Sequence, residues 1–355
     1  MINQHGASCA EIIFVRSAKQ IEDSRQVLTE LRERVGQSDD MLTSLDWFTS
    51  RTLMWDATPV IVLQRLDGIV QSAVLLHVRC WHGISTGVLK CGNLTGDGGV
   101  VAPAAERARV LQQAMTLLLS HRFVHTVIAT FRQPGGSLAI PTTRAVHWQP
   151  REMRCRLDLS GGLDSFLMRQ SRKFRRNFRY YRRRAEVELG CRFVPELTAA
   201  QSVAAVRALH GQGTHPVPTR RALMHEQALR STPGAFAMGL IDQDGQWLSY
   251  LAGWRQGDTV SVEWQLNLVD PETTSFSTVM RSFFLEHEAT NGVQSVQFVG
   301  GTARSWARAC EPETCYDILA TRTDPIGRSV TALLAWLRPN GQMGLLHQQR
   351  GLNLQ

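Results

Sequence analysis

The order of predicted secondary-structure elements repeats once along this chain of 355 residues. In each half, two helical segments are followed by short β-strands, a loop, a helix and a further strand, as the change between the two hydrophobic periods indicates. No sequence identity between the halves accompanies the repeat, so it rests on element order alone. It predicts two domains of similar construction, and the chain length favours the same number.

The elements of the first half surround a hairpin with an Asp67-Gly68 turn. A glycine-rich loop at 96–99 precedes a long helix, and it forms either a phosphate cradle or a plain tight turn. The expected helices are 17–35, 38–56 and 104–120, and the expected strands are 11–16, 59–66, 69–79, 85–91 and 126–131.

The second half repeats this order after a basic segment. Its expected helices are 198–211, 220–229 and 278–291, and its expected strands are 236–242, 247–255, 259–268 and 293–299. The expected domains are residues 11–150 and 196–325, with a basic helical connector at 151–195 and a terminal helix and mobile tail at 326–355.

One segment carries the whole basic excess of the chain. Residues 171–184 hold eight Lys or Arg and no acid, and the remaining 31 basic residues equal the 31 acidic ones. Phe174, Phe178 and Tyr181 recur at spacings of four and three, which predicts a helix with an apolar stripe and a cationic face. This face is either solvated, a peripheral contact to nucleic acid or membrane, or an anion-binding wall beside an active site.

Cysteine content and hydropathy restrict the class of protein. The seven cysteines are scattered and form no C-x-x-C pair, so we expect neither a disulfide framework nor a metal site, and a reducing cytoplasm is the simplest location. The first residues lack the pattern of a signal peptide. No uncharged apolar stretch approaches the roughly 18–20 residues that cross a bilayer, so we expect no transmembrane segment.

Residues 171–179 read Ser-Arg-Lys-Phe-Arg-Arg-Asn-Phe-Arg and match the pattern Ser-Arg-Lys/Arg-x-Arg-x-Asn. Together with the repeated element order, this motif resembles the BioF2-like acetyltransferase group of the GNAT superfamily, which is related to the Fem-type peptidyltransferases. The resemblance covers roughly residues 15–320. It implies an α/β (α+β) fold of two tandem GNAT-like domains, each a mixed, mainly antiparallel sheet flanked by helices.

The chain departs from the pattern of that group near its C-terminal end. Gln297 and Gly300 stand where members have Asp and Arg, and Ser305-Trp306 replaces Tyr-Lys. The turn before the last long helix reads Ser275-Phe276-Ser277 in place of Ser-Pro-Gly. A weakened donor loop, or loss of activity, is therefore an open alternative.

The resemblance implies acetyl-CoA or another acyl-CoA as the donor, with its pantetheine along a strand and its pyrophosphate at a helix N-terminus. The hydroxyls at that terminus have a second reading as plain helix caps. The corresponding positions are Leu266, Asn267 and Leu268 for the strand, and Ser275, Ser277 and Thr278 for the phosphate turn. Phosphate of a donor or acceptor would meet Arg172, Lys173, Arg176 and Asn177 on the basic segment.

Acyl transfer to an amine also needs a base. Glu263 is the preferred candidate, because Val262 and Trp264 flank it and apolar surroundings raise a carboxyl pKa toward working pH. The alternating pattern of a strand equally allows this side chain to face solvent. Tyr316 is the candidate for the acid that protonates the leaving thiolate.

Three functions remain open from the sequence. The first is an acyl-CoA-dependent N-acyltransferase that modifies an amino sugar or amine of envelope or exopolysaccharide metabolism by direct transfer, with a small-molecule or lipid-linked, phosphorylated acceptor. The second is a Fem-type peptidyltransferase that takes its aminoacyl group from charged tRNA. The third is a catalytically decayed GNAT-like binding module.

Overall fold

The computed structural model divides the chain into two compact units, which are described separately below. The first unit comprises Met1–Glu152 and Thr314–Gln355, and the second comprises Met153–Glu313. The structure describes residues 9–14, 18–38, 40–54, 57–81, 84–91, 99–132, 146–210, 219–268, 275–299, 302, 304–329 and 332.

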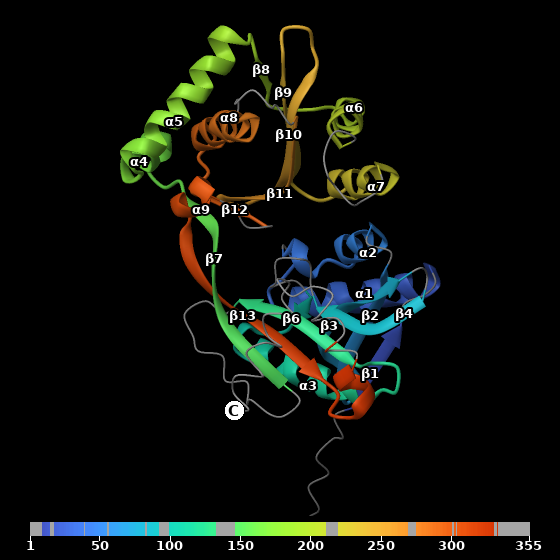
Figure 1. The fold of residues 1–355 in the computed structure, drawn as a ribbon. Coiled ribbons are helices and arrows are strands. Elements are labelled where there is room, and N and C mark those ends of the chain that lie inside the picture. Colours follow the sequence, from blue (N-terminus) through green and yellow to red (C-terminus); the bar gives the residue numbers. More distant parts are fainter. Residues whose placement is uncertain are drawn as a thin grey trace, which may run out of the picture. The chain divides into compact units, whose positions relative to one another are not determined.

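The first unit is a layered arrangement of helices and strands (Figure 1). Its elements are β1 (Cys9–Phe14), α1 (Ala18–Arg34), η1 (Met41–Thr43), α2 (Leu45–Met54), β2 (Ala57–Leu66), β3 (Ile69–Trp81), β4 (Ile84–Cys91), β5 (Val100–Val101), η2 (Ala104–Glu106), α3 (Arg107–Ser120) and β6 (Thr126–Arg132). It also takes most of β13 (Glu311–Thr321).

The sheet of the first unit is covered on both faces. Its described strands follow the order β1-β2-β3-β4-β6-β13, with β5 beside β3, and β4 and β6 are parallel. Successive residues of β2 point to opposite faces, as a pleated strand requires: Ile61 packs with α1 and α2, whereas Val62 packs with α3. The unit therefore has two apolar cores, one on each side of the sheet.

The second unit begins within β7 (Val146–Asp158) and continues to Glu313. Its elements are α4 (Gly162–Arg169), α5 (Arg172–Arg183), η3 (Arg184–Glu188), β8 (Arg192–Val194), α6 (Ala199–His210), α7 (Thr219–Arg230), β9 (Ala235–Ile241), β10 (Trp247–Gln256), β11 (Thr259–Asn267), α8 (Phe276–Thr290), β12 (Ser295–Phe298) and α9 (Arg304–Ala309).

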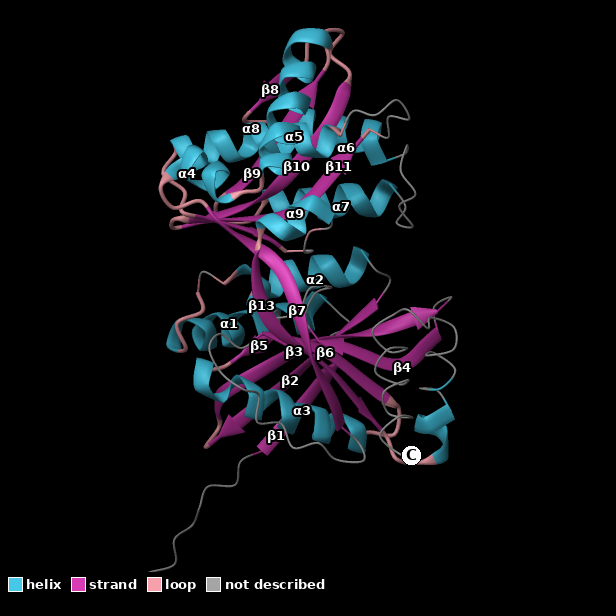
Figure 2. Cartoon of the chain, turned by 60° about the vertical axis from the view of Figure 1, so that its left-hand side comes forward, coloured by secondary structure: helices cyan, strands magenta, loops and turns pink. Residues whose placement is uncertain are grey.

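The sheet of the second unit also lies between two layers of helices. Its strand order is β7-β12-β11-β10-β9-β8, and β11 and β12 are the parallel pair among the described strands. Helices α5 and α8 lie on one face, and α6 and α7 lie on the other (Figures 1 and 2). The larger core fills the α8 side, where Met280 and Phe284 meet Val260 and Val262 of β11.

The two units have the same element order, as the sequence predicts. Two helices, three antiparallel strands, a helix and a parallel strand appear as α1 to β6 in the first unit and as α6 to β12 in the second. The fold class predicted from the sequence, two tandem GNAT-like domains with mixed, mainly antiparallel sheets, is confirmed.

In each unit, one strand of the sheet comes from outside the repeated elements. Strand β7 pairs with β12 of the second unit, through Leu157 opposite Val296. Strand β13 pairs with β6 of the first unit, from Cys315 opposite Arg132 to Thr321 opposite Thr126. Residues 314–325 therefore belong to the first unit, whereas the domain expected from the sequence, 196–325, includes them. The difference arises because β13 pairs with β6, which precedes it by far in the chain.

Some sequence-based expectations differ from the structure or fall outside it. Strands β7 and β13 and helix α4 are not among the elements expected from the sequence. The glycine-rich loop at 96–99 lies outside the described residues apart from Gly99, and so does the tail beyond residue 332. Among the helices of the described part of the chain, none combines the length and the apolar composition that a membrane span requires.

A close backbone contact fixes the register of β10 and β11. Ala252 lies opposite Trp264, but the next residue, Gly253, lies opposite Val262, so Glu263 is the extra residue of a β-bulge. A Cβ atom added to Gly253 would lie 1.8 Å from the carbonyl oxygen of Ser261. Only glycine permits the two backbones to approach in this way.

We predict that Gly253→Ala destabilises the protein by about 3 kcal/mol, because the new methyl group must displace the Ser261 backbone. Urea unfolding measures the change. The control is Gly245→Ala, where the added Cβ meets nothing within 4 Å although φ is +78°, so its cost is limited to about 1 kcal/mol. Equal losses in the two variants would contradict the close contact at Gly253.

Candidate active site

The bulge at Glu263 marks the point where β11 changes its surroundings. Before the bulge, Val260 and Val262 face the α8 core. After it, Trp264 contacts the rings of His225 and Tyr250 on the α7 side, with ring centroids 5.2 and 5.7 Å apart. β-Bulges next to active sites turn a side chain away from the regular alternation. Glu263, which is half-buried, is the side chain re-aimed here.

Strands β11 and β12 stop pairing at the same point. Their parallel register runs from Thr259 opposite Ser295 to Val262 opposite Phe298, and the N–H of Val299 donates to the carbonyl oxygen of Val262 at 2.9 Å. From Trp264 to Asn267, β11 continues to pair with β10. No described residue of β12 pairs with this stretch.

The donor-strand residues predicted from the sequence lie in this stretch. Leu266 is buried. The Asn267 side-chain oxygen accepts hydrogen bonds from Ser249 Oγ at 2.8 Å and from Gln265 Nε2 at 3.1 Å. Leu268 donates its N–H to Leu248, which extends the pairing with β10 by one residue.

Three hydroxyl groups gather at the N-terminus of α8. Ser275 Oγ lies 2.9 Å from Thr278 Oγ1 and 3.3 Å from Ser277 Oγ. The Ser275 side chain makes no capping hydrogen bond to the helix. Its carbonyl oxygen instead accepts from the N–H groups of Thr278 and Val279. The plain-cap reading is therefore wrong for Ser275, and the hydroxyls form a polar cluster at a helix end whose dipole favours anions.

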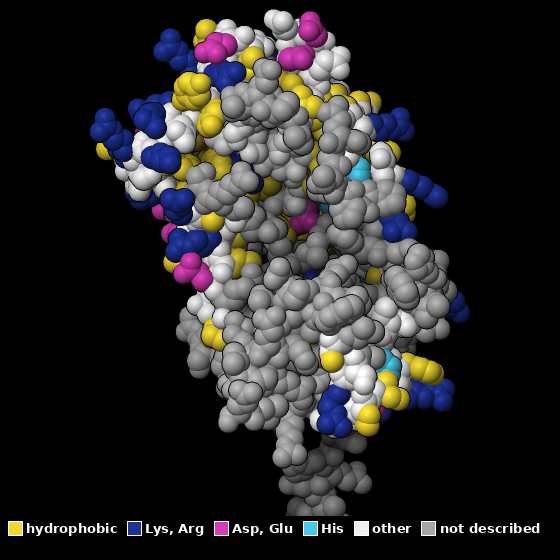
Figure 3. Space-filling view, in the orientation of Figure 1, with side chains coloured by type: hydrophobic (Ala, Val, Ile, Leu, Met, Phe, Trp, Pro, Cys, Tyr) yellow, Lys and Arg dark blue, Asp and Glu magenta, His cyan; other side chains and the backbone are white. Residues whose placement is uncertain are grey.

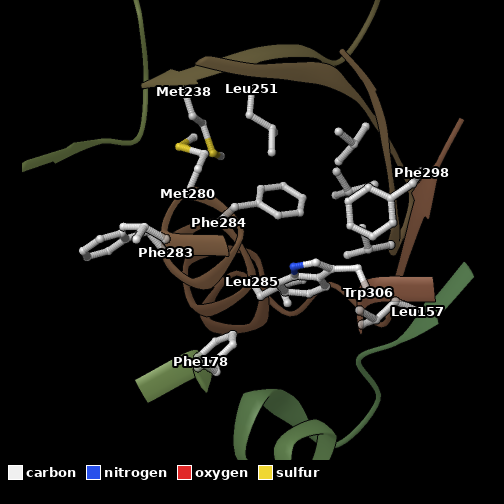
Figure 4. Packing of buried hydrophobic residues seen from close by; sticks show 14 of the residues in the cluster. Leu157, Phe178, Met238, Leu251, Met280, Phe283, Phe284, Leu285, Phe298 and Trp306 are labelled. Carbon is white, nitrogen blue, oxygen red and sulfur yellow. The ribbon is translucent and has the colours of Figure 1, made fainter. Parts of the chain in front are cut away.

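Trp306 links this cluster to the basic helix. Its indole Nε1 donates to Thr278 Oγ1 at 3.4 Å, and its ring meets Phe174 of α5 edge to face at 5.2 Å. Figure 4 shows Trp306 beside Phe298 in the core of the unit. The first turn of α5 and the first turn of α8 therefore approach the same indole.

Helix α5 has the apolar stripe and cationic face that the sequence predicts. Phe178 is buried, and Phe174 and Tyr181 pack against the same core. Some of its cations are satisfied locally: Arg182 pairs with Glu286 at 2.6 Å, and Arg175 Nη1 donates to the Gln170 carbonyl oxygen at 2.7 Å.

The remaining cations of α5 face solvent. The structure gives no ion pair or hydrogen bond with described residues for the exposed side chains Arg172, Lys173, Arg176, Arg179 and Arg183. Asn177 is half-buried at the edge of the apolar stripe. In Figure 3, Lys and Arg side chains gather over α4 and α5. The predicted phosphate-binding residues are thus available on the helix that Phe174 connects to Trp306.

A further cation lies inside the unit. Arg281 of α8 donates from Nε to Gln265 Oε1 at 2.8 Å, and its guanidinium lies over the rings of Phe298 and Trp306, 4.5 and 5.2 Å from their centroids. Burial lowers the pKa of Arg281 to about 10. The group therefore remains charged at neutral pH. The sequence analysis missed it, although a lone Arg in the apolar run Val279–Leu285 was a usable signal.

A buried acid supports Trp264 from the α7 side. Glu226 accepts a hydrogen bond from the hydroxyl of Tyr250, and both side chains are fully buried. Burial raises the pKa of Glu226, and the hydrogen bond from Tyr250 partly opposes this. Burial also raises the pKa of Tyr250 well above its usual value. Because Tyr250 contacts Trp264, this pair holds the indole that follows Glu263.

Most of the predicted site residues belong to the second unit, whereas Tyr316 belongs to the first. Glu263, the donor-strand residues, the α8 hydroxyls and the α5 cations all belong to the second unit. Tyr316 is 7% exposed in a core of the first unit, on the β13 strand that pairs with β6. Among the described residues, no group of three or more His, Cys, Asp or Glu side chains has metal-binding geometry.

Comparisons with known proteins bear on the family and the fold of this chain. Residues 172–306 match the acetyltransferase (GNAT) domain family. No curated protein matches the chain. Similar solved structures include L-PGS from Bacillus licheniformis (11% identity, 89% of this chain and 97% of that chain, TM-score 0.54), FemX (10%, 86% and 96%, 0.54) and a tandem GNAT protein from the clavulanic acid biosynthesis pathway (14%, 89% and 99%, 0.49). The first two show that this chain shares their fold.

We predict that Glu226→Gln stabilises the protein at neutral pH by an amount on the order of 1 kcal/mol. The folded-state pKa of Glu226 is raised above its ordinary value of 4.5, so the folded state binds more protons than the unfolded state just above that pH. The wild type therefore loses stability as pH rises from about 4.5 through the folded pKa, whereas Gln keeps an acceptor for Tyr250 without charge. Urea unfolding between pH 4 and 8 measures this difference.

Glu196→Gln is the matched control, because Glu196 is exposed and its replacement leaves the pH dependence unchanged. A Glu226→Gln variant that follows the wild-type pH profile would show that this carboxyl does not titrate differently on folding.

Proposed function

We propose that this protein transfers an acyl group from an acyl-CoA thioester to an amine, because residues 172–306 match the acetyltransferase (GNAT) domain family. The observation that carries the proposal is the bulge at Glu263, where β11 leaves β12 within the unit whose α8 begins with three clustered hydroxyls. The proposed acceptor is the amino group of an amino sugar or amine of envelope or exopolysaccharide metabolism, as a small molecule or a lipid-linked, phosphorylated compound.

The donor would lie along β11. Backbone groups of Leu266, Asn267 and Leu268 would pair with the amides of its pantetheine arm, on the edge that β12 leaves. Its phosphates would meet the N–H groups and hydroxyls of Ser275, Ser277 and Thr278, where the α8 dipole favours negative charge. Acetyl-CoA is the simplest donor, and other acyl-CoA thioesters share the same recognition.

The reaction requires a neutral amine. We assign Glu263 as the base: its carboxylate accepts a proton from the amine as the nitrogen attacks the thioester carbonyl carbon. The C–N bond forms and the C–S bond breaks, with its electron pair leaving on the thiolate of coenzyme A. The thiolate then takes a proton from water, and protonated Glu263 returns its proton to the solvent, so that the carboxylate and neutral water are restored. Tyr316 is not assigned this proton, because it lies in the core of the other unit.

The cationic face of α5 favours a second candidate function. Exposed cations such as Arg172 and Arg176 suit the phosphates of charged tRNA as well as those of a small acceptor, so a Fem-type aminoacyl transfer is the alternative. A decayed binding module is the third outcome, given Gln297, Gly300 and Trp306. Two binding measurements distinguish the three functions. Binding of acetyl-CoA supports acyl transfer, and salt-dependent retention of tRNA supports aminoacyl transfer. A protein that binds neither acetyl-CoA nor tRNA would be a decayed binding module.

Acetyl-CoA should raise the melting temperature of both the wild type and Glu263→Gln. A ligand present at about 100 times its Kd adds roughly 2.7 kcal/mol of apparent stability. The same variant should lose about 10²- to 10⁴-fold in kcat with an amine acceptor, because general-base catalysis contributes that much. Thermal unfolding and release of the coenzyme A thiol are the two measurements.

The control for this variant is Glu196→Gln, an identical exchange at an exposed position, which should retain full turnover. Undiminished kcat in Glu263→Gln would remove Glu263 from the mechanism, and the absence of any acetyl-CoA shift in the wild type would remove the proposed donor.

Replacing both Arg172 and Arg176 by Ala should weaken binding of the phosphorylated substrate roughly 10- to 100-fold, since a hydrogen bond to a charged group contributes about 1.5–3 kcal/mol. The KM for that substrate should rise with little change in kcat, and its dependence on ionic strength should fall. Arg183→Ala, at the other end of α5, is the control. Equal effects of the two changes would indicate a diffuse charge effect rather than a site.

A further inference from the structure

Three arginines of the second unit lie over phenylalanine rings in the same manner. Arg182 lies 4.4 Å from the ring centroid of Phe283, and Arg255 lies 4.6 Å from that of Phe236. Arg281 lies 4.5 Å from the centroid of Phe298. Stacking of this kind fixes the plane of a guanidinium and leaves its N–H groups pointing outward along the edge of that plane.

Two of these arginines use that edge to bind a carboxylate. Arg182 Nη2 lies 2.6 Å from Glu286 Oε2. Arg255 lies 2.6 Å from the fully buried Glu288 and contacts both of its carboxylate oxygens. In each case the stacked cation is neutralised by an acid of the same unit, which is the usual condition for a cation removed from water.

Arg281 differs from Arg182 and Arg255 because its hydrogen-bond partner among the described residues is neutral. Among the described residues, its hydrogen bond is to the neutral amide oxygen of Gln265 through Nε. Within the described part of the chain, no carboxylate contributes to its pKa, which burial lowers and the Cys310 thiol raises. Nη1 and Nη2 make no hydrogen bond with the described residues. The fold thus holds a largely desolvated cation with its bidentate N–H edge uncommitted.

The position of Arg281 relates this edge to the candidate active site. Gln265 belongs to the part of β11 that no longer pairs with β12, and Phe298 is the last residue of β12 in the parallel register. Trp306, the second ring under the guanidinium, donates to Thr278 in the hydroxyl cluster. Arg281 also retains some exposure to solvent. The guanidinium therefore lies where β11 and β12 separate.

We propose that Arg281 binds an oxyanion, a carboxylate or a phosphate, of a ligand held between the separating ends of β11 and β12. The oxyanion takes the role that Glu286 and Glu288 play for Arg182 and Arg255. Only the identity of the ligand as an acyl donor or acceptor rests on the proposed function. The oxyanion comes from a donor phosphate, an acidic acyl group or an acceptor carboxylate.

The test uses Arg281→Met and Arg255→Met in the full-length chain. Arg255→Met strands the buried carboxylate of Glu288 and should lower the melting temperature by several degrees. Arg281→Met removes a cation without a carboxylate partner, so its melting temperature should equal or exceed that of the wild type. Inorganic phosphate or succinate, with sodium chloride at equal ionic strength as control, should raise the melting temperature of the wild type. The same additions should act at least tenfold more weakly on Arg281→Met.

Affinity measurements with acetyl-CoA, succinyl-CoA and free succinate identify the source of the oxyanion. Equal losses of acetyl-CoA and succinyl-CoA affinity in Arg281→Met assign it to a donor phosphate, and a loss restricted to succinyl-CoA assigns it to an acidic acyl group. A loss seen with free succinate but with neither thioester assigns it to an acceptor carboxylate. Arg281→Lys, which keeps the charge without the planar fork, should bind with intermediate affinity.

The proposal is overturned if Arg281→Met is destabilised as much as Arg255→Met or fails to fold, because Arg281 is then a structural tie. It is equally overturned if the variant responds to the oxyanions as the wild type does, or if the wild type responds to none of them. A wild type that binds phosphate or succinate through Arg281 but binds no acyl-CoA would refute the proposed function and leave this inference intact.

Discussion

The parallel pairing of β11 with β12 ends at Val262, and the candidate site depends on that limit. Up to Val262 the two strands exchange backbone hydrogen bonds, and beyond it the edge of β11 has no β12 partner among the described residues. The bulge at Glu263 lies at the same place and depends on the close approach of Gly253 to Ser261. The bulge thus changes the direction of the Glu263 side chain, and it lies where the edge of β11 proposed for the donor begins.

An aromatic cluster joins the helices around this point. Trp306 contacts Phe174 of α5, donates to Thr278 of α8 and lies under Arg281. Side-chain packing in a protein interior is dense enough that such contacts fix helix ends relative to one another. A shared apolar contact therefore helps to position the cationic face of α5 and the hydroxyl cluster of α8, beside the ion pair of Arg182 with Glu286.

Most of the arginines discussed above for the second unit either pair with a carboxylate or face solvent. Arg182 and Arg255, which are partly exposed and lie over aromatic rings, form ion pairs with Glu286 and Glu288. The arginines on the outer face of α5 remain in water, where an unpaired charge has little cost. Arg281 belongs to neither class. A cation desolvated without an acid lowers stability, so its retention is more readily understood through a ligand than through folding.

Local sequence determined a large part of this protein. The eight cations and the stripe of Phe174, Phe178 and Tyr181 specified α5, because helical period and charge are properties of adjacent residues. Turns such as Asp67-Gly68 and alternating apolar residues specified the hairpins and the repeated order, and with it the fold class. The tertiary structure alone decided what depends on distant residues. It paired β13 with β6, which placed Tyr316 in a core of the first unit, and it placed the bulge opposite Gly253. It also enclosed Arg281 between β12 and α9, because strand register and burial arise from contacts between segments that the chain order does not bring together.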